Sequence, residues 1–179
     1  MPGILTHFVV SYAIASRIVG YKRAVLLCLF GLLPDIDVFL GMHRWCTHSV
    51  AIATLIAIPL IGVIWLFKSR RLVRMAVVAY LLYIMHIVLD LFTAPTPLLW
   101  PVHQEAYMIS IEVMGFIEPG AEIGIVPRIE LYSESTRFVL QRVEGPIIST
   151  SDMLITIAIA LLLLIDRIDV LNRDSHPYR

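Results

Sequence analysis

Two long apolar runs constrain the fold of this chain more than any other feature. The run from His48 to Phe67 has no charged side chain after its first residue, and the run from Leu72 to Phe92 has only Arg74 near one end and Asp90 near the other. A helix rises about 1.5 Å per residue, so about 20 residues cross the ~30 Å hydrocarbon core of a bilayer. We therefore predict that both runs are transmembrane helices.

Three shorter apolar stretches accompany these runs. Ile4 to Val19 and Ala24 to Leu33 indicate a helical hairpin, and Ser151 to Ile165 indicates a C-terminal span. Apolar residues make up 59% of the chain, which is more than a soluble core of this size requires. We expect an all-α integral membrane protein with about five transmembrane or re-entrant helices.

The segment between Phe92 and Ser151 differs from the rest because it is polar and interrupted by Pro and Gly. Its alternating stretch from Ile129 to Tyr132 is typical of a strand. This pattern predicts a small mixed α/β cap outside the membrane. The expected domains are metal-site helices (1–101), a polar extramembrane cap (102–150), and a C-terminal transmembrane helix with a polar tail (151–179).

The distribution of Lys and Arg predicts the orientation, because short basic loops stay in the cytoplasm. Lys22 and Arg23 form one basic turn, the segment from Lys68 to Arg74 forms another, and further arginines follow the last apolar stretch. We therefore expect a multi-pass protein of the cell membrane, with the opposite ends of its helices and the cap outside. The first residues lack the basic segment of a cleaved signal peptide, which predicts a retained N-terminus.

Ionisable side chains inside apolar segments are costly unless they are paired or bind a metal. In the expected topology they gather at the external face, where His86 and Asp90 share one side of a helix at i and i+4. Imidazole and carboxylate together favour zinc, with manganese or iron as alternatives. Seven candidates exceed the four ligands of one zinc ion, so two ions are favoured over one. The candidate ligands are His7, Asp35, Asp37, His43, His48, His86 and Asp90.

Some of these residues also permit simpler roles. Asp37 could cap a helix or orient His43 from behind. Arg44 could be an interfacial side chain, but its position between His43 and His48 suits a guanidinium that clamps an anionic oxygen in bidentate fashion. Thr47 could equally satisfy the backbone or contact a substrate.

The motifs GLLPDID, HRWCTHSV and YLLYIMHIVLDLFTAPTPLLWP resemble the inner-membrane metal-dependent hydrolase family (YdjM-like). The resemblance covers His7 to Pro101 and implies a metal-dependent hydrolase whose ligands are the seven residues named above. Trp45 and Cys46 depart from the usual HRGxTHS-like element, and the segment from Ala94 to Pro97 lacks the usual Gly.

These features predict a membrane-embedded hydrolase that cleaves a phosphoester of a lipid or lipid-linked substrate with metal-activated water. Asp37 or Asp90 would accept the proton, and Arg44 would hold the phosphate. A zinc peptidase or amidase is the enzymatic alternative, although the chain has no HExxH motif. A metal-stabilised membrane scaffold or transporter component is the other alternative. The zero net charge gives no indication of a nucleic-acid partner.

Overall fold

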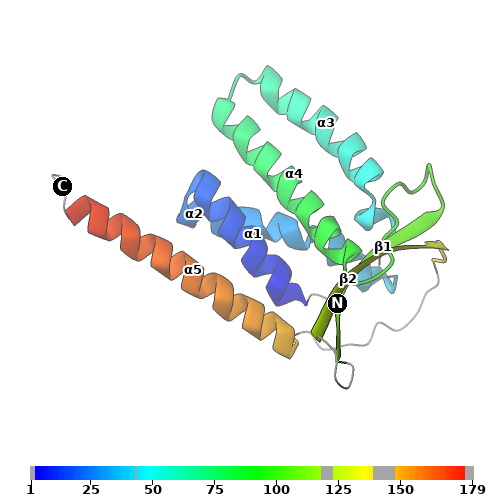
Figure 1. The fold of residues 1–179 in the computed structure, drawn as a ribbon. Helices are drawn as coiled ribbons and strands as arrows, with labels where there is room; N and C mark the ends of the chain where they lie inside the picture. Colours follow the sequence, from blue (N-terminus) through cyan, green and yellow to red (C-terminus); the bar gives the residue numbers. More distant parts are fainter. Residues whose placement is uncertain (1–2, 43, 118–122, 139–147, 176–179) are drawn as a thin grey trace.

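The computed structural model describes residues 3–42, 44–117, 123–138 and 148–175. Figure 1 shows helices lying beside one another, with a β-hairpin near the C-terminal end of the helix Arg70–Leu91. The elements, in chain order, are α1 (Ile4–Val19), α2 (Tyr21–Leu27), the 3₁₀ helices η1 (Cys28–Leu40) and η2 (Cys46–His48), α3 (Val50–Leu66), α4 (Arg70–Leu91), β1 (Glu105–Ile117), β2 (Ile123–Ser135) and α5 (Thr150–Ser175).

The N-terminal hairpin forms where it was predicted, although its second arm is irregular. Gly20 has a φ of 82°, which a residue without Cβ adopts easily, and its N–H bonds to the carbonyl of Ser16 at the end of α1. The chain turns there into the short helix α2 and then into η1. A 3₁₀ helix of 13 residues is unusually long. It ends at Gly41, whose φ is 70°, and it contacts both α1 and α4.

The small buried core joins the hairpin to α4. Ala15 of α1 and Ala24 of α2 are fully buried, and Leu82 of α4 is 1% exposed. The alanines allow the helices to approach closely, because a methyl group occupies little of the space between the helix backbones. This packing fixes the position of η1 relative to α4.

Helices α3 and α4 form an antiparallel pair (Figure 1). Each begins with a serine cap: Ser49 accepts a hydrogen bond from the N–H of Ile52, and Ser69 accepts one from Leu72. Helix α4 has 22 residues, which corresponds to about 33 Å, and it is long and apolar enough to cross a membrane. Helices α1 and α3 are apolar but shorter, with 16 and 17 residues.

The prediction of an all-α integral membrane protein with about five transmembrane or re-entrant helices is wrong in two respects. Strands β1 and β2 pair in antiparallel register from Glu105↔Ser135 to Ile117↔Ile123, so regular sheet is a substantial part of the chain. Within the described residues, α4 alone meets the length and hydropathy expected of a span. The apolar runs of α1 and α3 end after 16 and 17 residues, which makes them shorter than a bilayer-crossing helix usually is.

The cap contains strands but no helix in its described residues. The alternating stretch from Ile129 to Tyr132 lies in β2, as predicted. An isolated β-bridge between Thr96 and Tyr107 connects the β-hairpin to the segment that follows α4.

Helix α5 lies parallel to α1 and contacts it near both ends of α1. Near its start, Asp152 accepts hydrogen bonds from the N–H of Gly3 at 2.6 Å and the hydroxyl of Thr6 at 2.5 Å. Farther along, Asp166 forms an ion pair with Arg17. The pairs Gly3–Asp152 and Arg17–Asp166 are both separated by 149 residues, as expected for two parallel helices.

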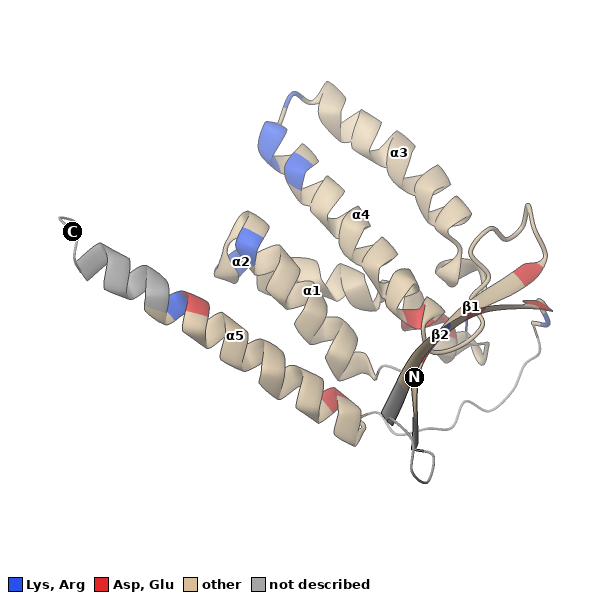
Figure 2. Cartoon of the chain, in the orientation of Figure 1, with Lys and Arg blue, Asp and Glu red and all other residues tan. Residues whose placement is uncertain are grey.

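Basic and acidic residues lie at different ends of the inner helices. Figure 2 shows Lys and Arg on α2 and around the α3–α4 turn. The acidic residues near the C-terminal end of α4 lie beside the β-hairpin. The two basic turns predicted from sequence are therefore on one side of the molecule. Helix α3 shows why this region needs an apolar environment, because none of its residues is buried and Leu55 is 73% exposed.

Candidate metal centre

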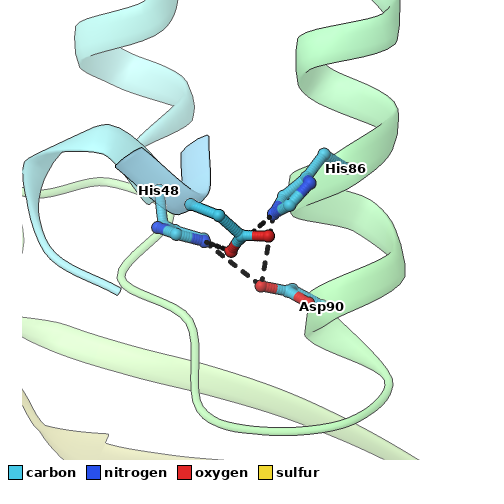
Figure 3. Close-up of side chains that lie close together, drawn as sticks. His48, His86 and Asp90 are labelled. Carbon is cyan, nitrogen blue, oxygen red and sulfur yellow. Dashed lines mark ion pairs between the residues drawn. The ribbon is translucent and has the colours of Figure 1, made fainter. Parts of the chain in front are cut away.

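Four side chains from three elements meet at the C-terminal end of α4, beside the β-hairpin. Asp35 comes from η1, His48 from η2, and His86 and Asp90 from the last turns of α4. One ligand atom from each lies within 4.8 Å of the others. Figure 3 shows His48, His86 and Asp90 pointing toward one another in the space between these elements. This group could hold a metal ion.

The spacing of these atoms suits a small tetrahedral ion. His48 Nε2 lies 3.2 Å from Asp90 Oδ2 and 3.6 Å from Asp35 Oδ1. His86 Nε2 lies 3.4 Å from Asp35 Oδ1 and 3.6 Å from Asp90 Oδ2. Ligands about 2.1 Å from a zinc ion in tetrahedral geometry are separated from each other by about 3.4 Å. These four imidazole–carboxylate separations are therefore close to those around a tetrahedral zinc ion.

Two buried atoms of this group make no hydrogen bond within the described part of the chain. They are Nε2 of His86 and Oδ2 of Asp90, whose residues are only 1% and 2% exposed. Buried polar atoms are nearly always satisfied, so such a pair requires an explanation. A shared cation would provide it for both atoms.

The charges of the group also favour a cation. Burial lowers the pKa of His48, but its close contacts with three surrounding carboxylates outweigh burial and raise the pKa to about 10. Burial would raise the pKa of Asp35, yet its close contacts with His48 and His86 hold that pKa well below its usual range. The carboxylates outnumber the permanent cations around them, and a divalent ion would neutralise that surplus.

Asp37 lies behind His48 and is outside the four-residue group. Its Oδ2 accepts hydrogen bonds from the N–H of Trp45 at 2.9 Å, the hydroxyl of Thr47 at 2.7 Å and Nδ1 of His48 at 3.1 Å. Asp37 is fully buried. A carboxylate on Nδ1 directs the opposite nitrogen of a histidine toward a metal. Of the two roles considered for Asp37, this geometry favours the orienting one, although its partner is His48 and not His43.

The backbone orients His86 in the same way. Its Nδ1 lies 2.7 Å from the carbonyl oxygen of Gly31 in η1. A Cβ added at Gly31 would come within 2.0 Å of the hydroxyl oxygen of Ser11, so only glycine fits between η1 and α1. Sequence reasoning missed Gly31, because a backbone carbonyl carries no side-chain signal.

His7 and Arg44 contact the other oxygen of Asp90. His7 Nε2 lies 3.4 Å from Asp90 Oδ1, and the His7 ring stacks on His86 with centroids 3.8 Å apart. Arg44 Nη2 lies 3.3 Å from the same oxygen and 3.4 Å from the hydroxyl of Thr93. Asp90 therefore faces the two histidines of the group with Oδ2 and faces His7 and Arg44 with Oδ1.

Arg44 has an uncommon backbone conformation. Its φ is 62°, which a residue with a side chain rarely adopts, and it is 8% exposed. Nε of Arg44 makes no hydrogen bond within the described residues. Such conformations persist only where the surrounding structure holds them, and they concentrate at functional sites.

His103 and Ser49 have partners outside the four-residue group. His43 lies outside the described residues, so its predicted role as a ligand remains a prediction. His103 is exposed and pairs with the hydroxyl of Tyr107 in the cap. The hydroxyl of Ser49 donates to the carbonyl of Trp100, which satisfies backbone.

The comparisons with known proteins give a family for the chain. A model of a family described as YdjM inner membrane protein matches residues 1–168. This match extends well past Pro101, where the resemblance found in the motifs ends. No curated protein and no solved structure matches the chain. Since the family model covers nearly the whole sequence, the chain belongs to the YdjM family of inner membrane proteins.

Proposed function

We propose that this protein is a metal-dependent hydrolase of the membrane, in which Asp35, His48, His86 and Asp90 hold one divalent ion, preferably zinc. The spacing of the four ligand atoms carries the proposal, since neighbouring donors lie 3.2 to 3.6 Å apart around buried imidazole and carboxylate atoms. Structural zinc sites in proteins are usually rich in cysteine, whereas sites with histidine and carboxylate ligands are typical of catalysis.

Access to the group supports a catalytic role. The side chain of Asp35 is 20% exposed, while those of His48, His86 and Asp90 are at most 3% exposed. A substrate would therefore approach from the side of Asp35. When bound, a divalent ion would polarise the scissile bond and lower the pKa of water toward neutrality.

The remaining polar residues suit proton transfer and anion binding. His7 and Asp90 form a buried imidazole–carboxylate pair that could accept a proton at the edge of the group. The Arg44 guanidinium contacts Asp90 and has an Nε–H that could donate to a phosphate oxygen. Asp37, which already accepts three hydrogen bonds, would act by orienting His48 and not as the base.

We propose a phosphoester of a lipid or lipid-linked molecule as the substrate, cleaved at the external face of the membrane. The basic turns lie at the opposite end of the helices from the metal group, which is the arrangement expected if those turns are cytoplasmic (Figure 2). The apolar surface of α3 and α4 would bring the site close to lipid headgroups.

One observation favours a metal-stabilised scaffold as the second candidate. Four protein ligands complete the coordination of a tetrahedral zinc ion, and a complete shell leaves no position for a substrate. The hydrolase requires instead that the exposed ligand Asp35 yields its position or that the ion accepts a fifth ligand.

The two candidates can be separated with the purified full-length protein in lipid nanodiscs. We expect metal-dependent release of phosphate or headgroup from a phospholipid, together with cleavage of bis-p-nitrophenyl phosphate. Removal of the metal by a chelator should abolish both reactions, and zinc should restore them. A protein that retains its metal and is stabilised by it, but cleaves neither phosphoesters nor a panel of peptides and amides, would be a scaffold.

A further inference from the structure

An apolar groove runs between α3 and α4 along most of their length. It encloses about 580 Å³. Its lining residues on each helix recur every three or four positions, so each helix contributes one continuous stripe. On α3 the stripe extends from Ile52 to Ile64, and on α4 it extends from Leu72 to Tyr83.

The groove has the length of a lipid chain. The α3 stripe covers 12 helical rises, or about 18 Å. One leaflet of the bilayer core, which is half of ~30 Å, is about 15 Å thick. A phospholipid acyl chain spans one leaflet, whereas a long polyisoprenoid chain would extend well beyond the groove.

The groove is too narrow for a helix to lie inside it. Its volume divided by its length gives a mean cross-section of about 30 Å². A helix with side chains is about 10 to 12 Å wide and would need roughly three times that area. Four alanines, two on each helix, leave this narrow space open: Ala53, Ala57, Ala76 and Ala79.

The lining offers nothing to a polar ligand. The hydroxyl of Tyr80 is paired with that of Thr54 at 2.7 Å, and the hydroxyl of Tyr83 donates to the carbonyl of Thr47. The other lining side chains from α3 and α4 are aliphatic, apart from the apolar thioether of Met75. Hydrocarbon is the chemistry that this surface can bury without leaving hydrogen bonds unmade.

One end of the groove reaches the metal centre. Thr47 lines the groove and also donates its hydroxyl to Asp37, which in turn bonds to His48. Leu33 lines the groove two residues before Asp35, the exposed member of the metal group. A chain lying in the groove would therefore end close to the metal group.

We infer that this groove binds one acyl chain of a membrane phospholipid and thereby positions the headgroup phosphoester at the metal centre. The inference rests on the proposed function and specifies its substrate class as a phospholipid with at least one long acyl chain. It also assigns Ala57, at the middle of the α3 stripe, as a position that determines whether the chain fits.

Photolabelling tests the groove without relying on catalysis. The full-length protein would be placed in vesicles of palmitoyl-oleoyl phosphatidylethanolamine that contain a small fraction of the same lipid with a diazirine on one acyl chain. After illumination, mass spectrometry would locate the adducts. We expect more adducts on the groove side of α3, around Ala57, than on Leu55 and Ile58, which lie outside the groove and are 73% and 64% exposed. Equal labelling of both sides of α3 would overturn the inference, because annular lipid alone gives that result.

A matched pair of tryptophan variants provides a second test of the groove. Ala57→Trp should fill the groove and reduce labelling there, whereas Leu55→Trp adds the same side chain on the exposed face and should not. Loss of contacts worth two buried methylene groups should lower kcat/KM for a long-chain phospholipid about tenfold in Ala57→Trp, with bis-p-nitrophenyl phosphate unaffected. Equal losses for both substrates, or groove labelling that Ala57→Trp leaves unchanged, would contradict the inference.

Metal content and melting temperature identify a variant that has misfolded, and Ala76→Phe, which fills the groove from α4, would then replace it. If the unmodified protein cleaves no phosphoester, the proposed function fails. The labelling pattern would still decide whether the groove holds an acyl chain.

Discussion

Asp37 and His48 form a fully buried pair in which Asp37 Oδ2 lies 3.1 Å from His48 Nδ1. This contact points the opposite nitrogen of His48 at Asp35 and Asp90. The carbonyl of Gly31 acts in the same way on His86. Each histidine is thus held through its Nδ1, which fixes the direction of its Nε2, as a metal ligand requires.

The role of Asp37 predicts a graded loss of metal affinity. In Asp37→Asn, His48 keeps a hydrogen-bonding partner but loses the charge behind it, so zinc affinity should fall about 10- to 100-fold while saturating zinc still fills the site. Asp35→Asn, which alters an atom of the metal group itself, should be the more severe change. Competition with a fluorescent zinc chelator measures both affinities. An Asp37→Asn protein that binds zinc as tightly as the unmodified protein would contradict the orienting role.

Gly31 predicts an effect on stability and metal binding from one added methyl group. Gly31→Ala places Cβ against Ser11, so overpacking should cost about 1 to 3 kcal/mol and displace the carbonyl that orients His86. Gly62→Ala is the control, because a Cβ there meets nothing within 4 Å. Thermal unfolding and zinc titration should show losses only for Gly31→Ala. The double variant Gly31→Ala/Ser11→Gly should recover most of them, and failure to recover would mean that crowding is not the cause.

Arg44 separates a phosphoesterase from a scaffold. Arg44→Lys keeps the charge but loses the planar fork, so it should retain metal and reduce phosphoester turnover, and Arg44→Ala should reduce turnover further. Because the φ of Arg44 is 62°, Arg44→Gly serves as a control that relieves the backbone while removing the guanidinium. Turnover, metal content and melting temperature would be measured on the same preparations. Turnover that is unchanged in Arg44→Ala would exclude the phosphate-binding role.

The orientation proposed for the membrane predicts which residues a reagent can reach. A cysteine at Glu112, which is exposed on β1, should react in intact cells with a maleimide that does not cross the inner membrane. A cysteine at Lys68, in the basic α3–α4 turn, should react only after the membrane is broken. Cys28 is buried and Cys46 is partly buried, so both would first be replaced to remove background. The reverse pattern would place the metal group at the cytoplasmic face.

Much of the metal group could be predicted from the sequence, because its members occur in short motifs with local geometry. His86 and Asp90 share a helix face at i and i+4, Asp35 follows the end of one apolar segment, and His48 begins another. Charged groups at such positions need a partner, which made them candidates. The division of roles between Asp35 and Asp37 could not be predicted, because it depends on how η1 turns against η2.

The remaining differences have similar causes. The link between Asp152 and Gly3 joins the two ends of the chain, and no local pattern reports a contact over that separation. The length of the β-hairpin was underestimated, because alternation of apolar and polar residues was evident only from Ile129 to Tyr132. The pairing extends over 13 positions of each strand. The apolar groove arises from alanines on two helices, which individually resemble ordinary packing residues.

Metal analysis of the purified full-length protein tests the central claim most directly. Elemental analysis of the unmodified protein, His86→Ala and His103→Ala should find about one zinc ion per chain in the first and third and almost none in His86→Ala. His103→Ala is the matched control, because His103 is exposed and pairs only with Tyr107 among the described residues. An unmodified protein that binds no divalent metal even after incubation with zinc, or a His86→Ala protein with full metal content, would contradict the account.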